Sequence, residues 1–203
     1  MTVEPARITR AERQAQTRER LVEVARELFL ADGYAATTLD KVAVAAGFSK
    51  GAVYSNFSGK EELCLAVLDD LHAEQIEGIV EAFSVKADLD GRIDAFVEWA
   101  RRSVGSPRYT ALEVEFAAAA RHSPFVAREL VKRHRDMRSA AAQLIARIAE
   151  QEGMELVLTP EEAATSLLSL GIGMGAMRSL DHTIDVGILA TTMRSLVRFR
   201  PKA

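Results

Sequence analysis

Apolar residues recur along almost the whole chain at spacings of three and four, which is the period of an amphipathic α-helix. The first such stripe begins near Gln14 and includes Leu21, Val24 and Leu28. We find no convincing alternation of apolar and polar residues of the kind that a half-buried strand shows. The pattern therefore predicts an all-α protein of about nine helices.

Capping and turn motifs mark where the first helices begin and end. Gly33 and Gly47 follow apolar stripes, at positions where a left-handed glycine commonly closes a helix. Thr37 is expected to cap the second helix and Ser49 the third, because a hydroxyl at the N-cap accepts a backbone N–H. Residues 1–12 are mostly polar and are expected to form a flexible arm.

Breaks that contain Ser, Gly or Pro separate the later helical stretches. A capping box at Ser58 is expected to open a long helix that ends near Phe83. Thr159 precedes Pro160 and two glutamates, a combination that favours the start of a helix. Further helices are expected at about residues 89–104, 109–121, 124–151, 160–178 and 185–199.

Composition and charge limit the function only loosely. The 203 residues are 48% hydrophobic and 27% charged, as in an ordinary folded protein, and the formal net charge is -3. Residues 1–64 hold nine Lys or Arg and nine Asp or Glu. Bulk charge thus gives no support to nucleic-acid binding, and such a function has to rest on a motif and on local charge.

The chain offers little chemistry for catalysis, metals or cofactors. Cys64 is the only cysteine, and we interpret it as a packed apolar residue rather than a redox thiol. The four histidines show no metal-binding spacing, and the glycines of residues 171–175 lie in a helical run without a preceding strand. We therefore expect neither an enzyme nor a cofactor. No apolar run suits a signal peptide or a membrane span, which predicts a cytoplasmic protein.

Residues 37–56 form the most informative segment. They predict two short helices joined by a turn at Gly47, with a polar second helix that carries Tyr54. This is the helix-turn-helix arrangement, which places its second helix in the major groove of DNA. The segment contributes to a longer pattern over residues 14–74: Leu28-Phe29, Asp32-Gly33-Tyr34, Thr37-Thr38, Val42-Ala43, Ala46-Gly47, Ser49-Lys50-Gly51, Val53-Tyr54, Phe57 and Lys60-Glu61-Glu62-Leu63.

In order, spacing and residue type, this pattern resembles the TetR (tetracycline repressor-like) family of transcriptional regulators. The resemblance implies that the third helix enters the major groove. It implies phosphate contacts from Thr38, Tyr54 and Lys60, and a phosphate or guanine contact from Lys50. The alternative for the polar residues is that they lie on a solvated helix face. The alternative for Tyr54 is that it packs in the core. The expected DNA contacts are Thr37, Thr38, Ser49, Lys50, Gly51, Ala52, Tyr54, Ser55, Asn56 and Lys60.

Two features of this region leave alternatives open. Phe48 and Asn56 depart from the residues common in the family, and Asn56 is suited to a bidentate adenine contact. Arg7, Arg10 and Arg13, together with Arg18, lead into the domain. They either follow the DNA backbone or belong to a solvated tail balanced by nearby glutamates.

The resemblance implies that residues 84–200 form a ligand-binding and dimerisation domain whose last two helices pair with a second copy. Residues 163–177 are small and apolar, as such pairing requires. A two-fold dimer predicts a near-palindromic operator of double-stranded DNA.

The same resemblance implies a small-molecule effector pocket between the middle helices. Core packing is the alternative for each aromatic candidate, and a surface salt bridge is the alternative for Glu113. His134 is expected to be a hydrogen-bonded core residue rather than a metal ligand. The candidates are Phe83, Phe96, Trp99, Tyr109, Glu113, Phe116, His134, Met137 and Met174.

The sequence thus predicts a ligand-responsive DNA-binding regulator, most simply a repressor that a small molecule releases from its operator. The alternative is an orphan or activating regulator whose second domain only dimerises.

Overall fold

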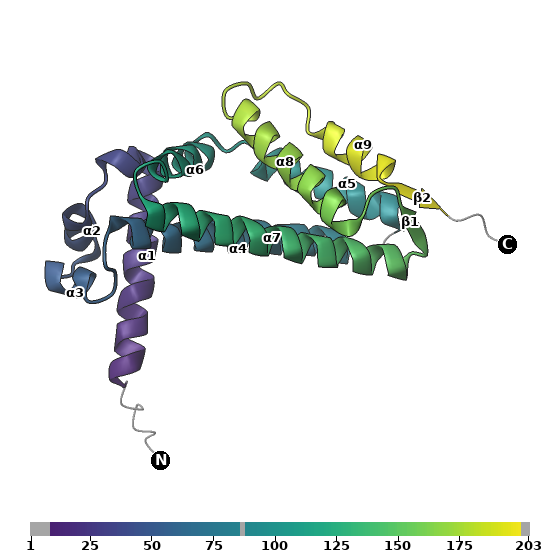
Figure 1. Cartoon of the computed structure of the whole chain (residues 1–203). Helices are drawn as coiled ribbons and strands as arrows, with labels where there is room; N and C mark the ends of the chain where they lie inside the picture. The colour runs from purple at the N-terminus through teal and green to yellow at the C-terminus, as the bar shows by residue number, and fades with distance from the viewer. Residues whose placement is uncertain (1–8, 86–87, 200–203) are drawn as a thin grey trace, which may run out of the picture. The chain divides into compact units, whose positions relative to one another are not determined.

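The computed structural model describes residues 9–85 and 88–199, so Arg7 lies outside the described residues. The chain folds as two compact units, residues 1–72 and 73–203. The described part holds nine helices and two three-residue strands, which confirms the predicted all-α class (Figure 1). The helices that begin in the first unit are α1 (Arg10–Ala36), α2 (Leu39–Ala46), α3 (Lys50–Tyr54) and α4 (Lys60–Ser84).

Helix α1 begins earlier than the sequence pattern predicted. Thr9 and Glu12 form a capping box, in which the Thr9 N–H donates to Glu12 Oε2 at 2.6 Å and the Glu12 N–H donates to Thr9 Oγ1 at 3.2 Å. The expected flexible arm is therefore helical from Arg10 onward. Gly33 does not close the helix either: its φ of 84° and ψ of 168° kink α1, which continues to Ala36. Only glycine adopts that conformation without strain.

The N-cap of α2 is Thr38 and not Thr37. The Thr38 hydroxyl accepts the Lys41 N–H at 3.2 Å. Thr37 is fully buried, and its hydroxyl donates to the carbonyl oxygens of Gly33 at 2.9 Å and Leu28 at 3.3 Å. The Thr37 hydroxyl thus ties the end of α1 to carbonyls at and before the kink, and Thr37 is too deeply buried to contact DNA.

The turn between α2 and α3 follows the prediction. Gly47 is left-handed, with φ 72° and ψ 24°, and Ser49 caps α3 by accepting the Ala52 N–H at 3.2 Å. The start of α4 differs from the expected capping box, because Glu62 rather than Glu61 pairs with Ser58. Its carboxylate accepts both the Ser58 N–H and hydroxyl at 2.8 Å, and the backbone N–H contributes most to lowering the pKa of Glu62.

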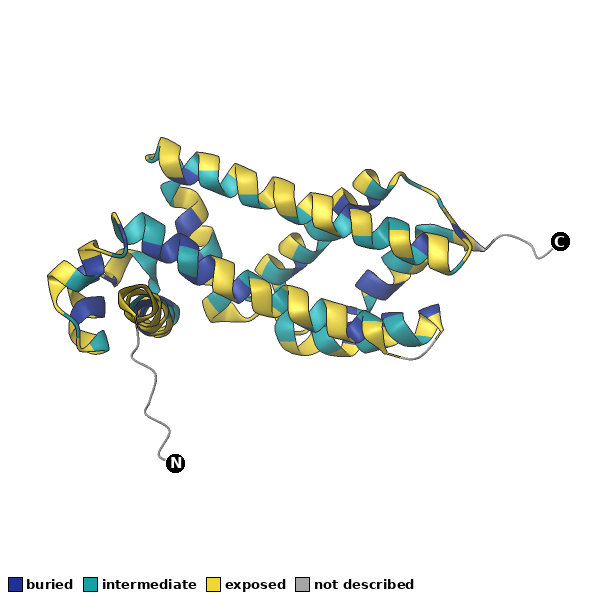
Figure 2. Ribbon diagram, turned by 90° about the horizontal axis from the view of Figure 1, so that it is seen from below, coloured by how far each residue is buried: buried dark blue, intermediate teal, exposed yellow. Residues whose placement is uncertain are grey.

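The core of the first unit forms where the apolar stripes of its helices meet. Figure 2 shows buried residues beside exposed ones within the helices. Cys64 is fully buried, in agreement with its interpretation as a packed residue. Val53 and Phe57, at 0% and 1% exposure, anchor α3 and the segment after it. Other large side chains that are at most 2% exposed here are Leu21, Phe29, Val42, Leu63, Val67 and Leu68.

The second unit contains the end of α4 and five further helices. Helix α6 begins two residues earlier than expected, because Pro107 is accommodated in its first turn. Thr159 and Glu162 form the predicted cap of α8. The helices are α5 (Leu89–Ser103), α6 (Pro107–Ala119), α7 (Pro124–Gln151), α8 (Pro160–Arg178) and α9 (Gly187–Ser195).

The last predicted helix, residues 185–199, is only partly correct. Helix α9 ends at Ser195, and β2 (Val197–Phe199) then pairs antiparallel with β1 (Met154–Leu156), with Glu155 opposite Arg198. Strands of three residues are too short for an alternating pattern to be visible in the sequence.

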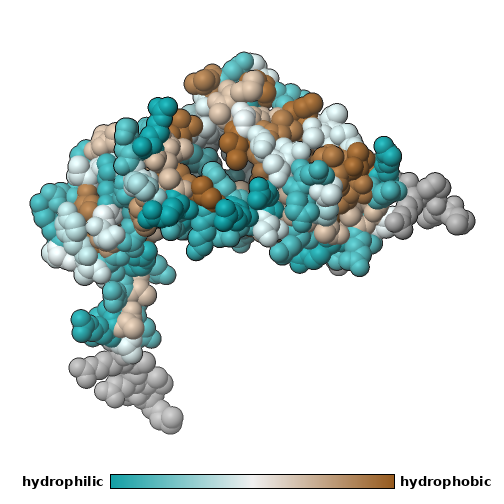
Figure 3. Space-filling model, in the orientation of Figure 1, coloured by the Kyte–Doolittle hydropathy of each residue, from teal (hydrophilic) through white to brown (hydrophobic). Residues whose placement is uncertain are grey.

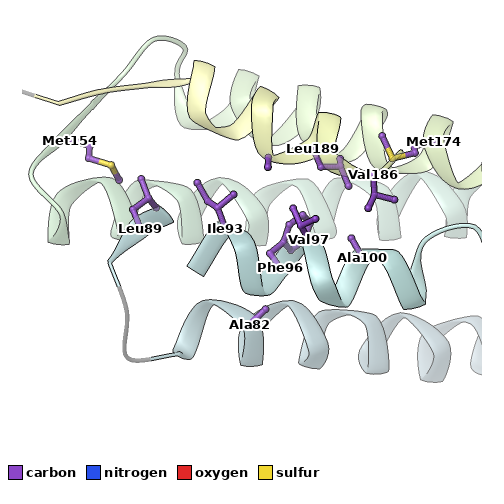
Figure 4. Close-up of a cluster of buried hydrophobic side chains, with 11 residues drawn as sticks. Ala82, Leu89, Ile93, Phe96, Val97, Ala100, Met154, Met174, Val186 and Leu189 are labelled. Carbon is purple, nitrogen blue, oxygen red and sulfur yellow. The ribbon is translucent and has the colours of Figure 1, made fainter. Parts of the chain in front are cut away.

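An apolar cluster joins these helices (Figure 4). The cluster includes Phe96 and Val97 of α5, Leu189 of α9 and Met174 of α8, and each of these side chains is at most 7% exposed. None of the described helices is long and apolar enough to cross a membrane.

Candidate DNA-binding surface

The exposed side of α2 and α3 carries most of the predicted DNA contacts. Helix α3 has only five residues, and the burial of Val53 fixes which side of it faces outward. Tyr54, on that outward side, is 58% exposed although its ring is large and apolar. We call the exposed polar and small residues of this side the reading surface: Thr38, Asp40, Ser49, Lys50, Gly51, Tyr54 and Ser55.

The two capping hydroxyls on this surface remain useful for binding. Thr38 and Ser49 each accept a backbone N–H from their own helix, through their oxygen atoms. A hydroxyl also has one proton to donate. Because both hydroxyls are exposed at helix N-termini, where the helix dipole favours anions, each is suited to donate to a phosphate oxygen.

Lys50 forms an ion pair on the reading surface. Its Nζ lies 2.5 Å from Asp40 Oδ2, and both side chains are more than half exposed. This hydrogen bond from Lys50 to Asp40 is the main reason why the pKa of Lys50 is raised. The ammonium group therefore stays charged, with two N–H groups beyond the one that Asp40 accepts.

Lys60, a predicted phosphate contact, caps the end of α1 in this structure. Its Nζ donates to the carbonyl oxygens of Tyr34 at 3.0 Å and Ala35 at 3.4 Å, and it lies 4.2 Å from the centre of the Tyr34 ring. Lys41 donates to the carbonyl of Ala36 at 2.9 Å. The last carbonyls of a helix lack helical partners, so both lysines stabilise α1. A phosphate contact from Lys60 requires it to leave these carbonyls.

Asn56 and Arg18 also have structural partners. The Asn56 amide donates to the carbonyl of Ala52 at 2.8 Å, so it turns toward its own helix rather than outward. Arg18 donates to the backbone carbonyl of Asn56 at 2.6 Å and lies 4.1 Å from the centre of the Phe57 ring. Arg18 therefore joins α1 to the end of α3 and does not belong to a free arm.

The structure thus divides the ten predicted contacts by exposure. Thr37 is buried, and Ala52, Asn56 and Lys60 are half-buried, whereas the others are exposed. Sequence reasoning missed Asp40 and the exposed Val44, which is 82% exposed on α2. Val44 lies outside the inward stripe of Leu39, Val42 and Ala43. Its exposure could therefore be predicted from its position in the helical period of α2.

The predicted effector-pocket residues do not share one environment. Phe96, Phe116 and Met174 are buried, and Trp99, Tyr109, Glu113 and Met137 are half-buried.

His134 is exposed, so its expected role in the core is wrong. Arg133 lies on the inward side of α7 instead, and its guanidinium is 2.7 Å from the Glu129 carboxylate.

Aromatic contacts fill the space around α5. The Phe96 ring lies 5.7 Å from Phe83 and 5.4 Å from Trp99, measured between centroids. The Trp99 indole packs against Gly78 so closely that a Cβ there would lie 2.2 Å from its Nε1. Glu113 accepts a hydrogen bond from Tyr109 at 2.8 Å, and burial is the main reason why the pKa of Tyr109 is raised.

Grooves occur elsewhere on the chain. One of about 790 Å³ runs along α1 and α4 within the first unit, and one of about 390 Å³ lies on α5. No predicted effector-pocket residue lines either groove. Within residues 9–85 and 88–199, no group of three or more His, Cys, Asp or Glu residues is arranged to hold a metal ion.

Comparison with known proteins identifies the family. A family model described as bacterial regulatory proteins, tetR family, matches residues 21–67. A second model, described as BetI-type transcriptional repressor, C-terminal, matches residues 90–198, which is more than half of the chain.

Individual relatives agree with these models. The HTH-type transcriptional regulator SrpR of Pseudomonas putida is 48% identical over 63 residues, which cover 31% of this chain and only 29% of SrpR. The HTH-type transcriptional regulator UidR of Escherichia coli (strain K12) is 26% identical over 165 residues, 81% of this chain and 82% of UidR.

A crystal structure of a TetR-family transcriptional regulator from Rhodococcus sp. has a TM-score of 0.74 at 16% identity, and the alignment covers 90% of this chain and 98% of that one. At this identity the likeness concerns the fold alone. The two family models show that the chain belongs to the TetR family of DNA-binding transcriptional regulators, which are not enzymes.

Proposed function

We propose that the protein is a ligand-responsive repressor that binds a near-palindromic operator as a homodimer, in the cytoplasm, where the chromosome is accessible. The observation that carries the proposal is the reading surface. Val53 and Phe57 anchor α3 in the core, while Lys50, Gly51 and Tyr54 face outward. An exposed short helix with a small residue, a cation and an aromatic hydroxyl suits insertion into the major groove.

Dimerisation through α8 and α9 is supported by their outer surface. Ile172 and Met177 of α8 are 59% and 58% exposed, and Leu180, just past α8, is 90% exposed. Apolar side chains gather over α8 and α9 (Figure 3). Exposed apolar residues grouped in this way favour a protein partner, and the same surface on a second copy is the simplest one. Two-fold symmetry then requires a near-palindromic operator.

Ligand control is proposed through the aromatic residues of α5 and their neighbours. Helix α4 runs without a break from Lys60 to Ser84, so we expect it to transmit the effect of a bound ligand from the second unit to the first. An effector releases DNA only if it binds the state with low operator affinity more tightly than the other state.

A second candidate function is regulation without a small ligand, with the second unit serving only for dimerisation. Trp99 packs closely on Gly78 and lines neither groove, which favours this alternative. Operator-release assays over a library of small apolar compounds separate the two candidates. Release of the operator by a compound that also raises the Tm of the protein supports ligand control. If no compound releases the operator, regulation without a small ligand is favoured.

The dimer proposal predicts the effect of Ile172→Glu. A carboxylate in an apolar interface lacks a partner, so we expect sedimentation analysis to show a monomer. Operator affinity is expected to fall about 100-fold, because each half-site then binds one subunit independently. Val131→Glu, at a residue of α7 that is 54% exposed, is the matched control and leaves the dimer intact. An Ile172→Glu protein that stays dimeric and binds normally contradicts the proposed interface.

A further inference from the structure

The reading surface carries a carboxylate where DNA would bring many negative charges. Between residues 37 and 59 the sequence holds two cations, Lys41 and Lys50, and one anion, Asp40. Lys41 is engaged by the carbonyl of Ala36, at the end of α1. Lys50 is paired with Asp40 at 2.5 Å. This segment therefore presents almost no net positive charge to a phosphate backbone.

That pairing is not needed to build the fold. Both side chains are mostly exposed, and exposed ion pairs contribute little to stability. Thr38 and Ser49 already cap α2 and α3, so neither helix depends on the pair for its first turn. A carboxylate beside the phosphates lowers the affinity for every DNA sequence, unless the bound sequence compensates for it.

We propose that Asp40 is a specificity-determining residue, which restrains Lys50 so that Lys50 reads a guanine instead of pairing with any phosphate. This inference rests on the proposed operator binding by α3. The number of N–H donors on Lys50 fits this proposal. Asp40 accepts one of the three N–H groups of Lys50, and the two that remain match the O6 and N7 acceptors on the major-groove edge of guanine.

The pair acts on non-specific and specific DNA in opposite directions. On non-specific DNA, Asp40 repels the phosphates and competes with them for Lys50. On the operator, the guanine binds a Lys50 that Asp40 already holds in place, so little side-chain freedom is lost on binding. Asp40 therefore raises the ratio of specific to non-specific affinity.

Selection of bound duplexes from a random pool tests the proposal with the full-length wild type and Asp40→Asn. We expect the wild type to enrich a palindrome with a guanine preference of about tenfold or more at one base pair in each half-site. In Asp40→Asn this preference falls below about twofold, while the other positions are kept. Non-specific affinity rises about threefold or more, and its salt slope steepens by about 0.9 because Lys50 reaches a phosphate.

Glu23→Gln is the matched control, since it removes one negative charge and breaks an exposed pair with Arg20 on α1. It is expected to keep the wild-type preference at every position. Lys50→Met provides a second measurement and must lose the same guanine preference. If either Asp40→Asn or Lys50→Met keeps that preference, the inference is overturned. If the wild type enriches no sequence, the proposed operator binding fails, and this inference fails with it.

Discussion

Gly51→Glu is expected to abolish operator binding while the protein stays folded. Gly51 is exposed on α3, and a Cβ built there meets only the Ser49 hydroxyl, at an ordinary 3.8 Å. A glutamate in the first turn of a helix is compatible with the helix dipole. On DNA the same carboxylate faces phosphates and base edges without a partner, so we expect a loss of at least about 100-fold in affinity. Fluorescence anisotropy with a labelled operator measures this loss.

Gly51→Ala separates the effect of this glycine on helix stability from its effect on the close approach of α3 to DNA. The fold has room for the methyl group, and replacing glycine by alanine within a helix stabilises it by up to about 1 kcal/mol. If Gly51 permits close approach to DNA, the variant has a higher Tm and a weaker affinity. Normal operator affinity in Gly51→Glu, with far-UV circular dichroism unchanged, contradicts the placement of α3 in the groove.

Phe57→Ala is expected to lower the free energy of unfolding by about 3–5 kcal/mol, as for other large aromatic residues in a core. Phe57 is 1% exposed, and the Arg18 guanidinium lies 4.1 Å from the centre of its ring. Removing the ring leaves a cavity beside Val53 and also removes the cation–π contact. Operator binding fails as well, because α3 loses its anchor. Urea unfolding followed by circular dichroism measures the change in stability.

Val44→Ala is the control for this stability measurement. Val44 belongs to the neighbouring helix α2 but is 82% exposed, so its truncation is expected to change the free energy of unfolding by less than about 0.5 kcal/mol. A Phe57→Ala protein as stable as Val44→Ala is inconsistent with a core centred on Phe57.

Signals that depend on a few neighbouring residues were predicted well from the sequence. The cap of α8 by Thr159 and the left-handed Gly47 follow from local backbone chemistry, and both are present. Val53 and Phe57 are apolar residues four positions apart, a helical spacing, and both are buried. The residues of the reading surface other than Asp40 are expected from the resemblance to the TetR family, and the structure places them on the exposed side of α2 and α3.

Features that depend on distant partners were missed. Thr37 and Thr38 are both suitable N-caps. They differ in the structure because the Thr37 hydroxyl donates to the carbonyls of Gly33 and Leu28, which lie earlier in the chain. The contacts of Lys60 with α1 are not visible in the local pattern, because its partners lie 25 and 26 residues earlier in the chain. The prediction for His134 is wrong by one position along α7, because Arg133 rather than His134 lies on the inward side. Successive side chains on a helix point about 100° apart.

Selection of bound duplexes from a random pool tests sequence-specific DNA binding through α3. Wild type and Gly51→Glu are carried through the same rounds, followed by sequencing of the bound fraction. We expect the wild type to enrich one near-palindromic site and Gly51→Glu to enrich nothing above the starting pool. A wild type without enrichment, or a Gly51→Glu protein that selects the same site, contradicts sequence-specific DNA binding through α3.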